Sequence, residues 1–154
     1  MLIGLHPLLT PDLLHALASM GHGDTIAIVD ANFPATACAQ RLIALDAADA
    51  PTVLTAILSV MPLDHMAEHP ARVMAVVGKP SQVPPAVADF ARVIARSIGQ
   101  KLAPHAVERH AFYAEARTAF AIVRSGERRF YGNILLTKGV IDAAGKAPKL
   151  PGLR

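Results

Sequence analysis

The sequence has a single cysteine, no tryptophan and few other aromatic residues, and each shortage narrows what the chain can be. Cys38 has no second cysteine for an internal disulfide, so we expect a reducing compartment and a small buried thiol. Two Tyr and five Phe leave little surface for stacking nucleic-acid bases. The Lys and Arg residues are scattered apart from a basic tail, so a net charge of +3 does not predict a nucleic-acid partner.

Long hydrophobic runs are also missing. Charged residues or proline interrupt every apolar stretch before the ~18 residues that a membrane span needs, so we expect no membrane association. Residues 1–7 lack the basic start, the apolar stretch and the small-residue cleavage site of a secretion signal. We therefore expect a cytoplasmic protein.

The common motifs of cofactor and metal chemistry are absent too. The chain has no GxGxxG, no P-loop and no GxSxG, and its seven histidines form neither HExxH nor a Cys/His zinc pattern. We therefore expect no cofactor, no metal and no covalent nucleophile.

The composition favours one compact, self-associating domain. A chain of 154 residues can bury one sizeable core without disulfides. With 53% hydrophobic and only 18% charged residues, it carries more apolar surface than a typical monomer, and subunit contacts are the simplest place for it. We assign residues 1–141 to the domain and 142–154, rich in Ala, Gly, Lys and Pro, to a loose tail.

Hydrophobic periodicity predicts alternating helices and strands. Thr10 and Pro11 are typical of a helix start, and Gly21 is typical of a helix end. The predicted helices cover 11–20, 51–61, 85–98 and 109–117, and the predicted strands cover 25–29, 42–45, 72–77, 120–123 and 133–136. This alternation predicts an α/β fold, a single-domain three-layer α/β/α sandwich with a mixed sheet.

Two polar groups bracket the predicted strand 25–29. Before it, Gly21 and Gly23 let the backbone turn tightly around an accessible His22, a side chain type that gives and takes protons near neutral pH. After it, Asp30 stands at a strand end, where α/β sheets collect ligands and a carboxylate can accept hydrogen bonds from hydroxyls. A helix-ending turn with an incidental histidine and an Asx turn are the plainer interpretations.

Three further clusters suit a polar ligand. Asp64, just beyond a predicted helix, fits acid–base chemistry, although an aspartate there is often merely solvated. Arg109 and Tyr113 pair a hydrogen-bond donor with a ring that can cover the C–H face of a pyranose, but they also fit an ordinary surface helix. Tyr131 and Asn133 offer hydrogen-bonding groups at the entry to the last strand, where a simple turn would look similar.

In their order and spacing, several fragments resemble the L-fucose mutarotase branch of the fucose mutarotase/ribose pyranase family, over about residues 7–140. The fragments are MGHGD at 20–24, DANFP at 30–34, FY at 112–113, AFAIV at 119–123, GE at 126–127, YGNI at 131–134 and KG at 138–139. The ribose branch typically has Gly-Leu-Pro after its strand aspartate, where this chain has Ala-Asn-Phe-Pro. That difference favours a fucose-like sugar.

The resemblance implies a cofactor-free enzyme of α/β/α fold that forms homo-oligomers, commonly rings of dimers such as a decamer, with sugar sites near subunit contacts. It implies a monosaccharide substrate and no nucleic acid or membrane as partner. It also implies three catalytic candidates and five substrate-binding positions. The catalytic candidates are His22, Asp64 and Tyr113, and the binding positions are Asp30, Arg109, Tyr131, Gly132 and Asn133.

Anomer exchange fits this set of residues. The anomeric hydroxyl loses a proton while the ring oxygen gains one, so an acid and a base suffice. Our hypothesis gives His22 one of these roles and Asp64 or Tyr113 the other, with His22 facing the pocket that contains Asp30 and Arg109. The alternatives are a D-ribose pyranase-type activity, a non-catalytic sugar-binding or transport-accessory protein, and an oligomeric scaffold without sugar affinity.

Overall fold

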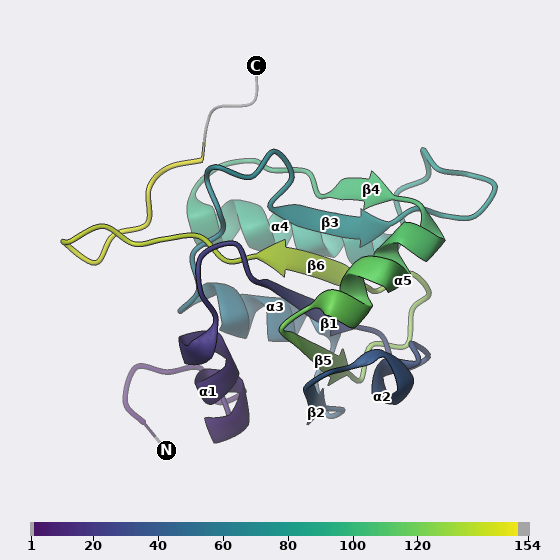
Figure 1. The fold of residues 1–154 in the computed structure, drawn as a ribbon. Coiled ribbons are helices and arrows are strands. Elements are labelled where there is room, and N and C mark those ends of the chain that lie inside the picture. Colours follow the sequence, from purple (N-terminus) through teal and green to yellow (C-terminus); the bar gives the residue numbers. More distant parts are fainter. Residues whose placement is uncertain (1, 151–154) are drawn as a thin grey trace.

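The computed structural model describes residues 2–150, in which five helices and six strands form one sheet-based unit (Figure 1). The helices are α1 (Pro11–Ser19), α2 (Ala35–Cys38), α3 (Ala50–Leu58), α4 (Pro85–Ile98) and α5 (Arg109–Thr118). The strands are β1 (Thr25–Val29), β2 (Leu42–Leu45), β3 (Ala71–Met74), β4 (His105–Val107), β5 (Ala121–Ser125) and β6 (Ile134–Thr137). Residues 142–150 of the predicted tail contain no helix or strand, and residues 151–154 lie outside the described residues.

The strands form a mixed sheet in the order β2-β5-β1-β6-β3-β4. β1 pairs in parallel with β5 and antiparallel with β6, and β6 is also antiparallel to β3. The pairs β2 with β5 and β3 with β4 are parallel. β6 therefore runs opposite to the other five strands, which is visible in Figure 1 from its arrow beside β3.

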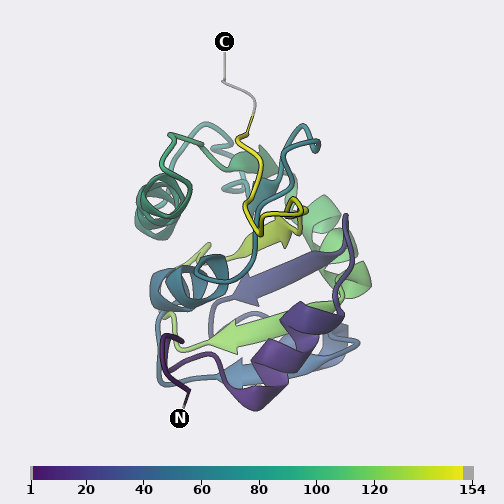
Figure 2. The ribbon, with the colours of Figure 1, turned by 90° about the vertical axis from the view of Figure 1, so that its left-hand side faces the viewer.

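Helices cover both faces of the sheet, which confirms the predicted three-layer architecture. Ile26 and Ile28 of β1 point into a core shared with α1, α3 and α4. Ala27 and Val29, on the opposite face because side chains alternate along a strand, join a core shared with α2 and α5. Figure 2 shows α3 and α4 on one side of the sheet and α5 on the other.

Local signals set the helix ends. The Thr10 side chain accepts a hydrogen bond from the Leu13 amide, and Pro11 occupies the first turn of α1, as predicted. α4 matches its predicted range of 85–98 and ends at Gly99, whose φ of +68° is the left-handed conformation that glycine adopts readily.

Two short elements were not predicted. α2 is a single turn without a side-chain cap, and β4 has three residues on the edge of the sheet, so neither produces a periodic pattern. The strand predicted at 72–77 is also shorter, because β3 ends at Met74 and the chain continues as a loop. Within residues 2–150, no helix has the length and apolar character needed to cross a bilayer.

The path of β6 connects two opposite edges of the sheet, each formed by strand ends. Because β6 is antiparallel to β1, its first residues lie beside the end of β1 and its last residues lie beside the start of β1. The "Asp30 end" is the edge where β1 ends and β6 begins. The "His22 end" is the opposite edge, where β1 begins and β6 ends.

Two phenylalanines of very different burial should contribute differently to the free energy of unfolding. Phe90 of α4 is fully buried, whereas Phe130 is 77% exposed. We expect Phe90→Ala to lower the free energy of unfolding by about 3–5 kcal/mol, since it leaves a cavity in the core. Phe130→Ala should change it by about 0.5 kcal/mol or less. Denaturant titration measures both, and equal losses would contradict the packing of α4 described here.

Candidate active site

The loop that carries His22 is fixed by the end of β6. The Gly23 amide donates to the Lys138 carbonyl at 2.9 Å, and the Lys138 amide donates to the Asp24 carbonyl at 2.9 Å. The Lys138 ammonium also donates to the Met20 carbonyl at 2.6 Å, at the end of α1. These bonds hold the loop from both sides and leave the His22 side chain 43% exposed.

His22 contacts Asp64, which lies 42 residues later in the sequence. His22 Nε2 lies 3.1 Å from Asp64 Oδ1, and the Met66 amide donates to the same oxygen at 3.0 Å. Burial alone would raise the pKa of Asp64, but these two hydrogen bonds and the charges of His22 and His65 outweigh it and lower that pKa. Asp64 is therefore a carboxylate at neutral pH, able to orient the imidazole and to take part in proton transfer.

Close backbone approach brings Asp64 to this position. Leu63 forms an isolated antiparallel bridge with Lys138. A Cβ added to Gly139 would lie 2.5 Å from the Leu63 carbonyl oxygen and 2.8 Å from Asp64 Cα. Only glycine at residue 139 leaves room for this contact, which explains why the Lys-Gly pair follows β6.

At the Asp30 end, Asp30 and Asn133 form a buried, doubly hydrogen-bonded pair. The Asp30 amide donates to Asn133 Oδ1 at 2.9 Å, and Asn133 Nδ2 donates to Asp30 Oδ2 at 2.8 Å. Asp30 Oδ1 accepts from the Asn32 amide at 3.0 Å. Burial raises the pKa of Asp30 above its ordinary value, although the bonds from Asn32 and Asn133 oppose that shift.

A cavity of about 340 Å³ opens beside this pair. Tyr113 of α5 stacks on Phe33, with ring centroids 5.1 Å apart and planes 19° apart, and both rings line the cavity. The cavity thus combines hydrogen-bonding groups with an aromatic wall, which suits a ligand with hydroxyls on its edge and an apolar face. The residues that line it are Asp30, Asn32, Phe33, Met74, Arg109, Tyr113, Phe130, Tyr131 and Asn133.

Tyr131 lies in an unusual backbone conformation at this cavity. Its φ is +61°, the left-handed region that residues other than glycine rarely adopt. Its hydroxyl accepts a hydrogen bond from the Val77 amide at 3.3 Å, in the loop after β3. The next residue must be glycine, because a Cβ on Gly132 would lie 2.5 Å from Glu127 Cγ.

The expected single pocket is not formed within one chain. Asp30, Arg109, Tyr113, Tyr131 and Asn133 line the cavity at the Asp30 end, but His22 and Asp64 do not. His22 precedes β1 and Asp30 follows it, so they flank a strand of five residues, which extends about 17 Å. The structure therefore brings the predicted residues together as two groups at opposite edges.

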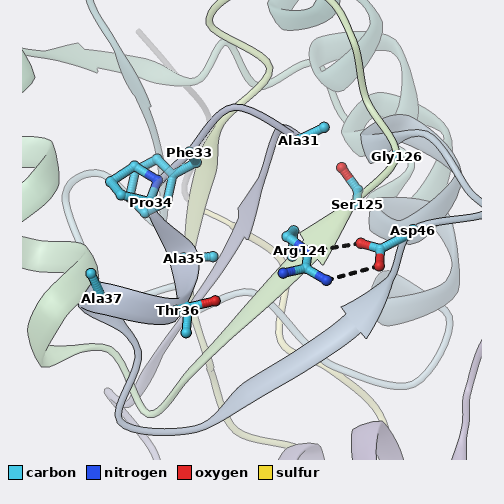
Figure 3. A pocket seen from close by; sticks show the side chains of 10 residues that line it. All are labelled: Ala31, Phe33, Pro34, Ala35, Thr36, Ala37, Asp46, Arg124, Ser125 and Gly126. Atoms are coloured by element: carbon cyan, nitrogen blue, oxygen red, sulfur yellow. Dashed lines mark hydrogen bonds and ion pairs between the residues drawn. The ribbon is translucent and has the colours of Figure 1, made fainter.

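A larger hollow of about 600 Å³ lies next to the Asp30 end and was not anticipated from the sequence. It shares Phe33 with the cavity described above and extends over α2 and the ends of β2 and β5 (Figure 3). Arg124 makes two hydrogen bonds of 2.8 Å to Asp46 there, so these charged groups satisfy each other. Nowhere in residues 2–150 do three His, Cys, Asp or Glu side chains converge as a metal site requires.

Comparison with known proteins identifies the class. The model of the RbsD / FucU transport protein family matches residues 3–141, and the chain belongs to this family. It is 40% identical to the fucose mutarotase of Homo sapiens over 144 residues, covering 90% of this chain and 93% of the human protein.

Solved structures agree with that assignment. A fucose mutarotase from Streptococcus pneumoniae, in complex with L-fucose, superposes with a TM-score of 0.85 at 37% identity, over 92% of this chain and all (100%) of that one. Bacillus subtilis RbsD complexed with D-ribose has a TM-score of 0.67 at 20% identity, over 89% of this chain and 98% of that one. The second likeness shows a shared fold only.

The Asp30 and Asn133 pair leads to a pH-dependent prediction. Asn133→Ala removes a donor that stabilises the charged form of Asp30, so the pKa of Asp30 should rise further. We expect a loss of about 1–3 kcal/mol in unfolding free energy, larger above the pKa of Asp30 than below it. Denaturant unfolding across pH measures this loss.

Asn32→Ala is the matched control, because its exposed side chain contributes no hydrogen bond to the pair. A loss for Asn133→Ala that shrinks as the pH rises would contradict the role given to this bond.

Proposed function

We propose that this protein is a mutarotase that interconverts the α and β anomers of free L-fucose. Family membership and the likeness to fucose mutarotases over nearly the whole chain support the activity. The observation that carries the proposal is the cavity in which the Asp30 and Asn133 pair lies beside the stacked ring of Tyr113. A pyranose needs both features, hydrogen bonds for its hydroxyls and a flat apolar surface for its C–H face.

The chemistry requires two proton transfers. The anomeric hydroxyl gives up its proton as the ring oxygen accepts one, and the bond between C1 and the ring oxygen breaks to leave an aldehyde. After rotation about the C1–C2 bond, the hydroxyl formed from the ring oxygen attacks the other face of the aldehyde carbon and recloses the ring. In our proposal His22 carries one transfer, and Asp64 or Tyr113 carries the complementary one.

We further propose that two copies of the chain share each active site. His22 and Asp64 lie at one edge of the sheet and the sugar cavity lies at the other, so one copy cannot place both on the same sugar. Each edge carries an exposed apolar side chain suited to a subunit contact, Met66 at the His22 end and Phe130 at the Asp30 end. A repeated contact between opposite edges closes into a ring when the rotation allows it.

Anomer exchange on its own tests the activity. Exchange NMR should show faster interconversion of L-fucose anomers with the wild-type protein, and we expect His22→Ala to slow the catalysed exchange about 10²- to 10⁴-fold. His15→Ala, which removes an exposed histidine from α1, is the control.

Each other outcome has a definite meaning. Unchanged exchange with His22→Ala would remove His22 from the mechanism. Fucose binding without faster exchange would leave a non-catalytic sugar-binding protein. A greater acceleration of ribose than of fucose would favour a D-ribose pyranase-type activity. We place the enzyme in the cytoplasm, where the lone buried Cys38 would remain reduced.

Mixing two inactive variants tests the shared site. His22→Ala damages only the His22 end, and Arg109→Ala damages only the Asp30 end. If copies share sites, co-refolded equal mixtures should regain about a quarter of wild-type activity, since that fraction of contacts joins two intact edges. Activity no greater than the sum of the separate variants would show that sites are not shared.

A further inference from the structure

The buried Glu127 and the half-buried Arg129 form an ion pair that takes no part in lining the sugar cavity. Glu127 is only 3% exposed. The Arg129 guanidinium donates to both of its carboxylate oxygens, from Nε at 2.9 Å and from Nη2 at 2.8 Å. The Arg129 amide adds a third bond to Glu127 Oε1 at 2.9 Å. Such a two-pronged contact fixes direction as well as distance.

The same arginine ties the loop to a helix. Its third nitrogen, Nη1, donates to Asp89 Oδ2 at 2.7 Å, and Asp89 lies on α4. Arg129 thus joins the loop between β5 and β6 to a helix whose buried residues are anchored in the main core. This loop, residues 126–133, carries Tyr131, Gly132 and Asn133.

Glu127 also contacts both chain segments that meet at the cavity. Its carbonyl accepts from the Ala31 amide at 2.9 Å, directly after Asp30. Its side chain lies against Gly132, where an added Cβ would come within 2.5 Å of Glu127 Cγ. A shift of Glu127 would therefore displace the sugar-facing backbone on both sides.

The loop needs such support because one of its residues is strained. The left-handed backbone of Tyr131 costs about 1–2 kcal/mol relative to the right-handed form, and it persists only where surrounding contacts impose it. The bond between the Tyr131 hydroxyl and the Val77 amide fixes the tip of the side chain, but it does not fix the backbone. The contacts of Arg129 and Glu127 supply the missing constraint.

The ion pair is permanent under working conditions. Hydrogen bonds from Arg129 lower the pKa of Glu127 despite its burial, and Glu127 and Asp89 raise the pKa of Arg129 further above its already high value. Both groups therefore remain charged at neutral pH, and the contact acts as a fixed support rather than a switch.

We propose that Arg129, held between Glu127 and Asp89, is a positioning residue that sets sugar affinity by keeping Tyr131, Gly132 and Asn133 in their binding conformation. This inference rests on the proposed mutarotase function. Arg129 reaches neither the cavity nor His22, so it acts on the sugar only through the loop. Its loss should weaken ground-state and transition-state binding equally, which raises KM and leaves kcat nearly unchanged.

The test compares three variants in the anomer-exchange assay with L-fucose. Arg129→Met should raise KM about tenfold while kcat stays within about twofold of wild type. Arg129→Lys should also raise KM, because an ammonium keeps the charge but cannot grip both carboxylate oxygens. Arg92→Met is the matched control, since Arg92 contacts Asp89 from the exposed side of α4 without touching the loop. It should leave KM unchanged.

A double variant separates positioning from stability. Arg129→Met leaves the buried carboxylate of Glu127 without its cationic partner, which should lower the melting temperature. Adding Glu127→Gln removes that unpaired charge, so the melting temperature should recover in part while KM remains high. Recovery of KM together with the melting temperature would show that Arg129 is only structural.

Two results distinguish this inference from the function on which it rests. A wild-type protein that fails to accelerate anomer exchange would refute the mutarotase function. A catalytically active wild type whose KM is matched within about twofold by Arg129→Met and Arg129→Lys would overturn the positioning role alone.

Discussion

The central constraint on this protein is that β1 is buried on both faces and paired along both sides, with β5 and β6. The last four of its five residues are fully excluded from solvent, and they pack against helices above and below the sheet. The strand therefore sets a fixed separation between the loop of His22 and the carboxylate of Asp30. β6, as the one described strand of opposite direction, serves both edges, because it begins beside Asp30 with Asn133 and ends beside His22 with Lys138.

Three buried carboxylates in the described chain are satisfied in three different ways, with different consequences for stability. Asp64 and Glu127 have lowered pKa values, so they stabilise the fold at neutral pH, and this contribution is lost as the pH falls through those values. Asp30 has a raised pKa because burial outweighs the opposing hydrogen bonds, including the one from the neutral amide of Asn133. Its contribution is present at low pH and is lost as the pH rises, so Asp30 is retained at some cost to folding.

That cost is understandable if Asp30 binds a hydroxylated ligand. A carboxylate paired with arginine would be more stable, but its oxygens would then be occupied, as those of Glu127 are. An amide partner leaves lone pairs free to accept bonds from a sugar. Burial of an incompletely compensated charge at a binding site is a common exchange of stability for function.

Much of the fold could be predicted from the sequence because its long elements carry periodic signals. The strand at residues 25–29 and the helix at 85–98 matched the structure residue for residue. The one-turn α2 and the three-residue β4 could not be predicted, since so few residues produce no period. The pairing of Asp30 with Asn133, more than a hundred residues later, depends on the strand order, which no local pattern encodes.

The placement of His22 shows a different limit. Resemblance to a family assigns a role to each matching residue, but it does not say which copy of the chain supplies that residue to a given site. The nine residues from His22 to Asp30 include the whole extended strand, so the separation of these two side chains follows from elementary strand geometry. A residue list that matches a family can therefore imply an assembly as well as a fold.

The proposed division of the site between two edges would also separate its two tasks. The Asp30 end holds groups suited to gripping hydroxyls, and the His22 end holds a pair suited to moving protons. Within one chain the two groups are separated by the length of β1, about 17 Å, so substitutions at the two edges should add in the free energy of unfolding. In the proposed assembly the two edges meet at one sugar, where different side chains supply affinity and proton transfer.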